Sequence, residues 1–228
     1  MGSLKDKQVV LDFVRQDELT NRLRSLLTGE NEKRSTILIN GSFDPAELTE
    51  CPRKLFYKAT GPHHGATYFS QNTQSFVREK WLSYFDKCSR IRVAKKHIVA
   101  TDRNYNISGY ADAVIEIGEY LAVITIKGVE ASIYEIIKEQ TARKKDIVEL
   151  MIYSWLLEIK DGILIYENLN NQEYIIFHII PYRPIIESIK KKCLDLFCMK
   201  SKLVEPERPY KTKASKECKK CQFNIKCW

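Results

Sequence analysis

A β-hairpin signal at residues 107–130 is the feature that most constrains how this chain can fold. The stretch reads ISGYADAVIEIGEYLAVITIKGVE, in which two runs rich in β-branched residues meet at Gly118-Glu119. A two-residue loop at that point would place Asp112 opposite Thr125, with their Cβ atoms roughly 5 Å apart. Lys127 would share the face of Thr125, because side chains alternate along a strand. The pattern therefore predicts that these three polar side chains converge at the far end of the hairpin.

The segments around the hairpin predict a mixed α/β fold. Helical and strand-like patterns alternate along the chain: helices at 71–85, 133–141, 146–159 and 184–199, and strands at 91–100, 164–166 and 174–180. This order favours a single central mixed sheet flanked by helices. We expect three parts, namely an N-terminal helical segment over 1–34, an α/β core over 35–200, and a basic linker with a cysteine tail over 201–228.

Charge and hydropathy narrow the class of partner. The chain carries 37 basic and 29 acidic residues, a net charge of +8, and its pI is about 9.0. Residues 202–226 alone have a net charge of +5. This balance favours a polyanionic partner. No apolar run reaches the about 18 residues of a membrane span, and we find no secretion signal, so we expect no membrane partner and a reducing, cytoplasmic location.

Cysteine spacing predicts a metal centre. Cys218, Cys221 and Cys227 form a CxxCx5C knuckle, and Cys51 is the best candidate for a fourth ligand. Asp44-Pro45 is expected to start the helix that carries Cys51. Four thiolates suit either zinc or an iron–sulfur cluster, and the three-plus-one arrangement favours a [4Fe–4S] cluster over zinc.

The other cysteines and the histidines are expected to be structural. Cys193 and Cys198 lie on the apolar side of a helical pattern and are predicted to fill the core. His63-His64 sit in a loop rich in Pro and Gly, with no acidic neighbour. His97 and His178 lie within strand patterns, where a histidine is usually a structural residue whose ring nitrogens have hydrogen-bond partners.

Four motifs and the cysteines together carry a resemblance to a known family. They are CPRKLFY at 51–57, GYADAVI at 109–115, ITIKG at 124–128 and ELMIY at 149–153. With the terminal cysteines, they resemble the iron–sulfur RecB-type nucleases of the PD-(D/E)XK superfamily. That group includes CRISPR-associated RecB-family exonucleases and the nuclease domain of AddB-type helicase-nucleases. The resemblance runs from about residue 36 to the end of the chain, and it implies that family's nuclease core with a four-cysteine cluster appendage.

The resemblance also implies roles for individual residues. In the family, an Asp, a Glu and the backbone carbonyl between Glu and Lys hold Mg²⁺ or Mn²⁺, while the Lys acts on the attacking water. Here Asp112, the Ile126 carbonyl, Lys127 and Tyr153 match the family's pattern. Judged from the residues alone, a salt bridge between Asp112 and Lys127 across the strands is the structural alternative.

Three positions depart from the family's pattern. Thr125 stands where the family has Glu, Glu149 where it has Gln, and Arg78 where an upstream helix often has His. A hard divalent ion is held largely by carboxylate charge, so these changes weaken the expected metal site. Glu149 could supply the missing carboxylate, or it could form a surface pair with Lys145.

Three functions remain open at this point. The first is a DNA-binding protein with a degenerate metal site, acting on single strands or duplex ends within complexes of CRISPR or recombination type. The second is an active single-stranded DNA exonuclease that uses Asp112, Glu149 and Lys127. The third is a zinc-stabilised protein-interaction module. For the first two, the expected DNA contacts are Arg78, Arg208, Tyr210, Lys211 and Lys213.

Overall fold

A computed structural model of the chain describes residues 41–61 and 68–228. The expected N-terminal helical segment over 1–34 and the His63-His64 loop lie outside the described residues.

The described residues form one five-stranded sheet with the order β1-β2-β3-β4-β5. β1, β2 and β3 are antiparallel neighbours, β4 runs parallel to β3, and β5 is antiparallel to β4. The parallel step needs a crossover, and α4 and α5 provide it. The strands are β1 Ile91–Asp102, β2 Ile107–Ile117, β3 Tyr120–Val129, β4 Asp161–Asn168 and β5 Tyr174–Ile179.

The predicted hairpin is present with the predicted register. Ile117 pairs with Tyr120, and the ladder of β2 and β3 runs from that pair to Ala113 and Ile124. Gly118 opens the two-residue loop with a φ of 63°, a conformation that glycine adopts without a steric penalty. Because the loop length sets the register, this part of the fold follows directly from the sequence.

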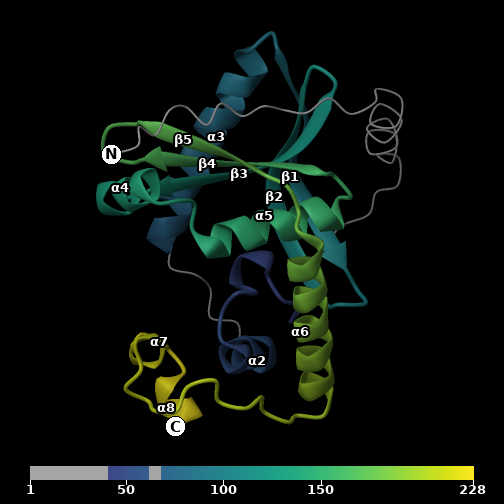
Figure 1. Cartoon of the computed structure of the whole chain (residues 1–228), viewed down its shortest axis with the longest axis vertical. Helices are drawn as coiled ribbons and strands as arrows, with labels where there is room; N and C mark the ends of the chain where they lie inside the picture. The colour runs from purple at the N-terminus through teal and green to yellow at the C-terminus, as the bar shows by residue number, and fades with distance from the viewer. Residues whose placement is uncertain (1–40, 62–67) are drawn as a thin grey trace.

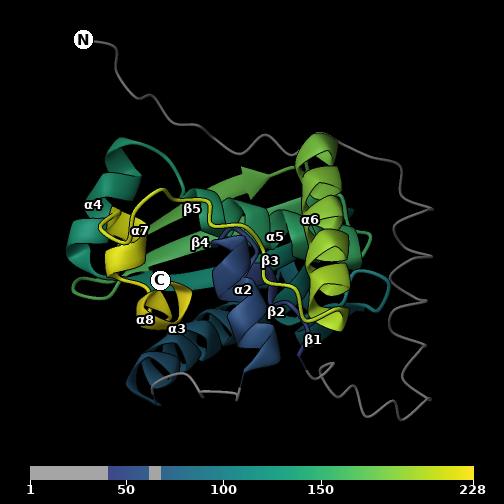
Figure 2. The ribbon, with the colours of Figure 1, turned by 90° about the horizontal axis from the view of Figure 1, so that it is seen from below.

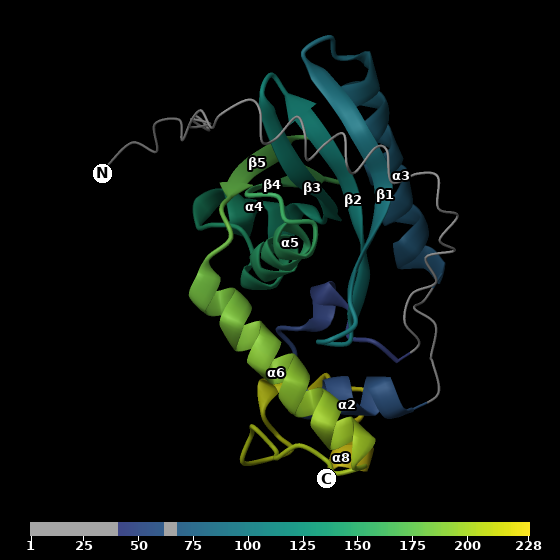
Figure 3. The ribbon, with the colours of Figure 1, turned by 90° about the vertical axis from the view of Figure 1, so that its right-hand side faces the viewer.

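Helices cover both faces of the sheet, as Figures 1 and 3 show. α3 (Tyr68–Lys87) packs on one face against alternate residues of β2, β3 and β4, while α4 (Ala131–Glu139) and α5 (Lys144–Leu156) pack on the other. A third apolar cluster joins α5 to α2 (Pro52–Thr60) and α6 (Arg183–Ser201). The predicted fold class, a mixed sheet flanked by helices, is confirmed.

The expected helix from Asp44-Pro45 through Cys51 is wrong. A 3₁₀ turn, η2 (Pro45–Glu47), ends before Cys51, and α2 starts separately at Pro52. Cys51 is the residue before that helix, with φ −55° and ψ 130°. A proline disfavours the helical conformation of the residue before it, so Pro52 enforces this break.

The C-terminal tail packs against α2. Residues 202–215 contain no helix or strand, as expected of a linker, and the tail ends in α7 (Lys216–Lys219) and α8 (Asn224–Cys227). In Figure 2, α2 lies between α6 and α8. The ring of Phe223 lies 5.5 Å from that of Tyr57, and Arg53 forms an ion pair with Glu205. Cys51 and the terminal cysteines are thereby brought to the same end of the molecule.

Candidate functional site

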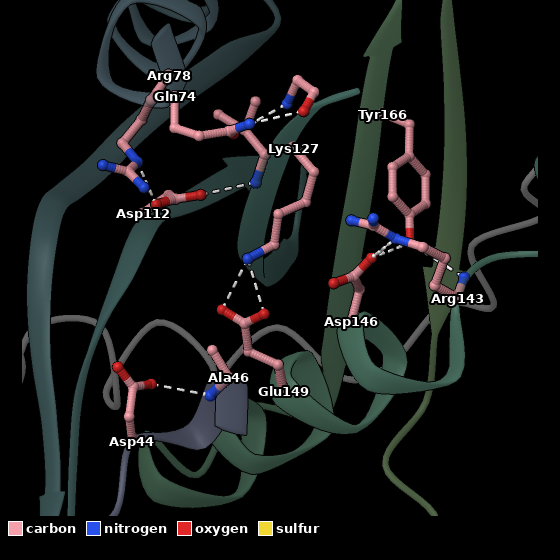
Figure 4. A network of polar contacts seen from close by, with 12 residues as sticks. Asp44, Ala46, Gln74, Arg78, Asp112, Lys127, Arg143, Asp146, Glu149 and Tyr166 are labelled. Carbon is pink, nitrogen blue, oxygen red and sulfur yellow. Dashed lines mark hydrogen bonds and ion pairs between the residues drawn. The ribbon is translucent and has the colours of Figure 1, made fainter. Parts of the chain in front are cut away.

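The candidate site lies where β2 and β3 stop pairing with each other. Beyond Ala113 and Ile124, two backbone N–H groups of β3 are bound by side chains instead of by a strand. The Ile126 N–H donates to Asp112 Oδ2 at 2.7 Å, and the Gly128 N–H donates to Gln74 Oε1 at 3.0 Å. Gln74 also donates through Nε2 to the Gly128 carbonyl at 2.6 Å. The strands therefore separate at Asp112, and side chains fill the space between them (Figure 4).

Both carboxylate oxygens of Asp112 have partners. Oδ2 accepts from the Ile126 N–H, and Oδ1 forms an ion pair with Arg78 of α3. The Asp112 side chain is only 7% exposed, and that of Arg78 is 30% exposed. Burial raises the pKa of Asp112, and the charge of Arg78 opposes that rise. Arg78 thus stands against the carboxylate that the family resemblance assigns to the metal.

Lys127 forms a second, separate ion pair. Its Nζ lies 2.9 Å from Glu149 Oε1 and 2.7 Å from Oε2, and Glu149 comes from α5. Burial raises the pKa of Glu149, with Lys127 acting in the opposite direction. For Lys127, burial acts to lower the pKa, but the charge and hydrogen bond of Glu149, together with the charges of Asp112 and Asp146, raise it overall.

The structure excludes two alternative pairings of these residues. Glu149 is 5% exposed, so the surface pair with Lys145 is wrong. The cross-strand pair of Asp112 with Lys127 is not formed, because each has another partner. Glu149 does face the candidate site, as the hypothesis of an active exonuclease requires, but its carboxylate already forms an ion pair with Lys127.

Thr125 is buried next to these pairs and is 2% exposed. Among the described residues, its hydroxyl has no hydrogen-bond partner. Thr125 lies on the same side of the sheet as Lys127, as the strand alternation predicts. A neutral hydroxyl therefore occupies the position at which the family resemblance would place a carboxylate.

Tyr153 lies one turn after Glu149 on α5 and is 3% exposed. Burial raises its pKa, and the charge of Glu149 adds to that rise, so the phenol stays protonated. A Cβ atom at Gly109 would lie 2.8 Å from the Tyr153 hydroxyl and 2.7 Å from Pro45 Cδ. Gly109 of the GYADAVI motif thus lets β2 pass close to α5 and η2.

Sequence reasoning missed Asp44 as part of this site. It precedes η2, and its Oδ1 accepts from the Ala46 N–H at 2.9 Å. The residue is exposed, yet desolvation by the atoms around its carboxyl group raises the pKa of that group. The charge of Lys127 is among those that oppose the rise. The sequence marked Asp44 only as a helix start, and nothing local could show that η2 packs against α5.

A buried network positions α5 behind the site. Tyr166 of β4 donates its hydroxyl hydrogen to Asp146 Oδ2 at 2.6 Å, and Arg143 Nε lies 2.6 Å from the same oxygen. The backbone N–H of Arg143 also donates to the Tyr166 hydroxyl. These bonds join the first turn of α5 to the sheet and so hold Glu149 and Lys127 in register (Figure 4).

The arrangement does not fit a divalent ion. The carboxylates of Asp112 and Glu149 are engaged with Arg78, Lys127 and a backbone N–H. Within residues 41–61 and 68–228, no group of three His, Cys, Asp or Glu side chains is placed to hold one metal ion. The role of the Ile126 carbonyl as a metal ligand stays a prediction.

The four predicted cysteine ligands surround one cavity. Cys51, Cys218, Cys221 and Cys227 all line a space of about 280 Å³ between α2 and the tail. Its other walls include the aromatic rings of Tyr57, Tyr210, Phe223 and Trp228. A water molecule takes roughly 30 Å³ of liquid volume, so this space is far larger than a single ion.

The remaining predicted DNA contacts fall into two groups. Arg208 donates through Nε to the Cys227 carbonyl at 2.8 Å, and its guanidinium lies 4.7 Å from the centre of the Trp228 ring. Tyr210 is partly buried at the cysteine cavity. Lys211 and Lys213 are exposed. Arg208 and Tyr210 thus help to form the tail, and the DNA role of all four stays a prediction.

Comparison with known proteins places the fold. The sequence matches no family model and no curated protein. Among solved structures, the protein SSO0001 shares 18% identity, with a TM-score of 0.52 over 92% of this chain and 93% of that one. An alkaline exonuclease from Laribacter hongkongensis shares 11% identity, with a TM-score of 0.55 over 73% and 91%.

A putative exonuclease from Eubacterium rectale gives the same result. It shares 11% identity, with a TM-score of 0.54 over 83% of this chain and 91% of that one. In the described part of this chain, no helix is long and apolar enough to cross a membrane. At these identities the likeness shows the fold alone, and that fold is the one seen in exonucleases.

Proposed function

We propose that this protein binds DNA on a RecB-type nuclease fold of the PD-(D/E)XK superfamily without cleaving it. The observation that carries the proposal is the state of Asp112, whose two oxygens are taken by Arg78 and the Ile126 N–H. A divalent ion would have to displace the guanidinium of Arg78, which already pairs with this carboxylate, to reach it. Thr125 offers such an ion only a neutral hydroxyl in return.

DNA is the partner that charge and fold favour together. The net charge of +8 suits a polyanion, and the residue 202–226 segment carries a net charge of +5. One of the similar structures, the Laribacter hongkongensis exonuclease, was also solved in complex with dAMP. For this chain we propose single strands or duplex ends as the ligand, with Lys211 and Lys213 contacting phosphates.

We further propose that the cysteine cavity holds a [4Fe–4S] cluster. The space is larger than one ion needs and four thiols line it, which favours the cluster over zinc. Cys51, Cys218, Cys221 and Cys227 would be its ligands. When bound, the cluster would link residue 51 to residue 227 and so stabilise the fold. A cluster of this kind fits a reducing cell interior.

The test is an assay of cleavage and binding with a labelled single-stranded oligonucleotide and Mn²⁺. We expect the wild-type protein to bind with an affinity that falls steeply with salt and to leave the DNA intact. Asp112→Ala and Glu149→Gln should likewise leave the DNA intact. Cleavage that both substitutions abolish would show that the metal site is active, and absence of any DNA binding would refute the proposal.

One observation favours an active exonuclease as the second candidate. Glu149 is buried and faces the site beside Lys127, so a carboxylate is present within reach of the space next to Thr125. For this to serve catalysis, Glu149 and Asp112 must both exchange their present partners for a metal ion. The same cleavage assay separates the two functions. Metal analysis of the purified protein tests the third, since a stoichiometric zinc content would support the interaction module.

A further inference from the structure

The gap between β2 and β3 holds an arginine where the fold's metal chemistry would need a cation. Arg78 is an ordinary surface residue by its position on α3, yet its Nε lies against the buried carboxylate of Asp112. A guanidinium carries a permanent positive charge, which is the property that a divalent ion supplies at such a site. We propose that Arg78 replaces the metal ion and binds one DNA phosphate directly, so that DNA binding needs no divalent cation.

Exposure supports this role. The Asp112 side chain is 7% exposed and that of Arg78 is 30% exposed, so the arginine is the more accessible member of the pair. Among the side chains that the structure describes, Asp112 is the ion-pair partner of Arg78. A guanidinium has five N–H donors, and one edge in contact with a carboxylate leaves donors for phosphate oxygens. The planar fork of arginine matches the geometry of a phosphate group.

Asp112 has a positioning role in this arrangement. Its second oxygen is fixed by the Ile126 N–H, so the carboxylate holds Arg78 at the gap between the strands. The cost is that its negative charge weakens the attraction of Arg78 for phosphate. Removing that charge while keeping the arginine should therefore strengthen DNA binding, whereas a site that depends on a metal ion would lose affinity.

Other charged side chains near the gap also affect how strongly a phosphate would bind there. Lys127 is neutralised by Glu149, while Asp44 brings a further carboxylate whose pKa the surrounding protein raises. Asp44 would repel a bound phosphate and would attract a metal ion. Asp44→Asn should therefore strengthen DNA binding if Arg78 contacts the phosphate directly, and should weaken it if a metal ion does.

The inference rests on the proposed DNA binding, and one titration series tests it separately. Fluorescence anisotropy with a fluorescein-labelled single-stranded oligonucleotide is measured in EDTA and in Mn²⁺ for the wild type and each variant. We expect the same dissociation constant in both solutions. Arg78→Ala should weaken binding about tenfold, as expected for loss of a charge-assisted hydrogen bond, and should lower the salt slope by about 0.7.

A matched control is available on the same sheet. Arg92 of β1 also forms an ion pair with a carboxylate, that of Glu116, but near the hairpin turn. Arg92→Ala should leave affinity nearly unchanged. If it weakens binding as much as Arg78→Ala does, or if EDTA abolishes wild-type binding, the role of Arg78 is overturned while DNA binding itself stands.

Asp112→Asn and Asp44→Asn keep the proposal testable if Arg78→Ala loses DNA binding only because it fails to fold. Both keep the arginine and remove a negative charge, so both should tighten binding in EDTA. Weaker binding by these two variants, with thermal unfolding unchanged, would contradict the proposal.

Discussion

The gap between β2 and β3 and the cysteine cavity differ in whether the protein itself supplies partners for their polar side chains. At the gap, the protein supplies every partner for its charges, since Arg78 pairs with Asp112 and Lys127 with Glu149. At the cavity, four thiols line a space that the described side chains do not fill. The charges of the first region are paired within the chain, whereas the thiols of the second face the open space in which we propose a cluster. The difference teaches that polar side chains gathered in one place indicate a bound group only where the chain itself does not supply their partners.

The largest expected effect is at the cavity. Cys221→Ser should remove one cluster ligand, bleach the absorbance that cluster thiolates give and lower Tm by about 10 °C, because the link between Cys51 and the tail is lost. Absorbance and thermal unfolding, measured on protein purified without oxygen, check this.

The matched control for that variant is Cys198→Ser. Cys198 is exposed on α6 and does not line the cavity. It should change neither colour nor Tm. Equal behaviour of the two variants would mean that the cavity holds no group that depends on its cysteines.

The next effect is at the gap. Lys127→Met would leave the buried carboxylate of Glu149 without its cation and should lower the free energy of unfolding by about 3 kcal/mol. Adding Glu149→Leu should recover most of that loss, because no unpaired charge then remains. Urea unfolding of both variants measures the difference.

An exposed pair provides the control for this prediction. Lys138 lies 3.9 Å from Glu173, and both side chains are more than half exposed. Lys138→Met should cost well under 1 kcal/mol. A similarly small cost for Lys127→Met would show that the pair at the gap is not closed to water.

The smallest expected effect concerns the thiol of Cys193, which is buried in the apolar core. Cys193 is 0% exposed, and burial raises the pKa of its thiol to about 12 from 9.0. A raised pKa keeps the thiol protonated, so alkylation should not increase between pH 7 and pH 9 in the folded protein. Stability that depends on this thiol should fall only above pH 9, where the unfolded chain begins to lose the proton.

Mass spectrometry after alkylation measures this reactivity. Cys88 and Cys198 are exposed and should be alkylated in the folded protein, whereas Cys193 should react only after denaturation. Equal labelling of Cys193 and Cys198 would contradict the burial.

The sequence predicted what depends on local spacing. The register of β2 and β3 followed from the two-residue loop at Gly118, and the mixed sheet followed from the order of segments. The prediction that both Cys193 and Cys198 fill the core is correct for Cys193 and wrong for Cys198, which is exposed. Helical periodicity gives the apolar side of α6 but not where that side ends.

The pairs at the gap could not be predicted, because they join elements that are distant in sequence. Arg78 reaches Asp112 from α3, and Lys127 reaches Glu149 from α5. For Glu149 the sequence offered Lys145 as an equally good partner, and only the docking of α5 on the sheet decides between them. Asp44 joined the site for the same reason, through the packing of η2 on α5.

We infer that the chain's own charges close the site at Asp112 to a divalent ion. The most direct measurement is the number of Mn²⁺ ions bound per chain, followed by electron paramagnetic resonance, for the wild type and for Arg78→His combined with Thr125→Glu. We predict no specific Mn²⁺ site in the wild type, and one in the double variant, which restores a carboxylate and an imidazole beside Asp112. One Mn²⁺ bound by the wild type and lost on Asp112→Ala would contradict the account.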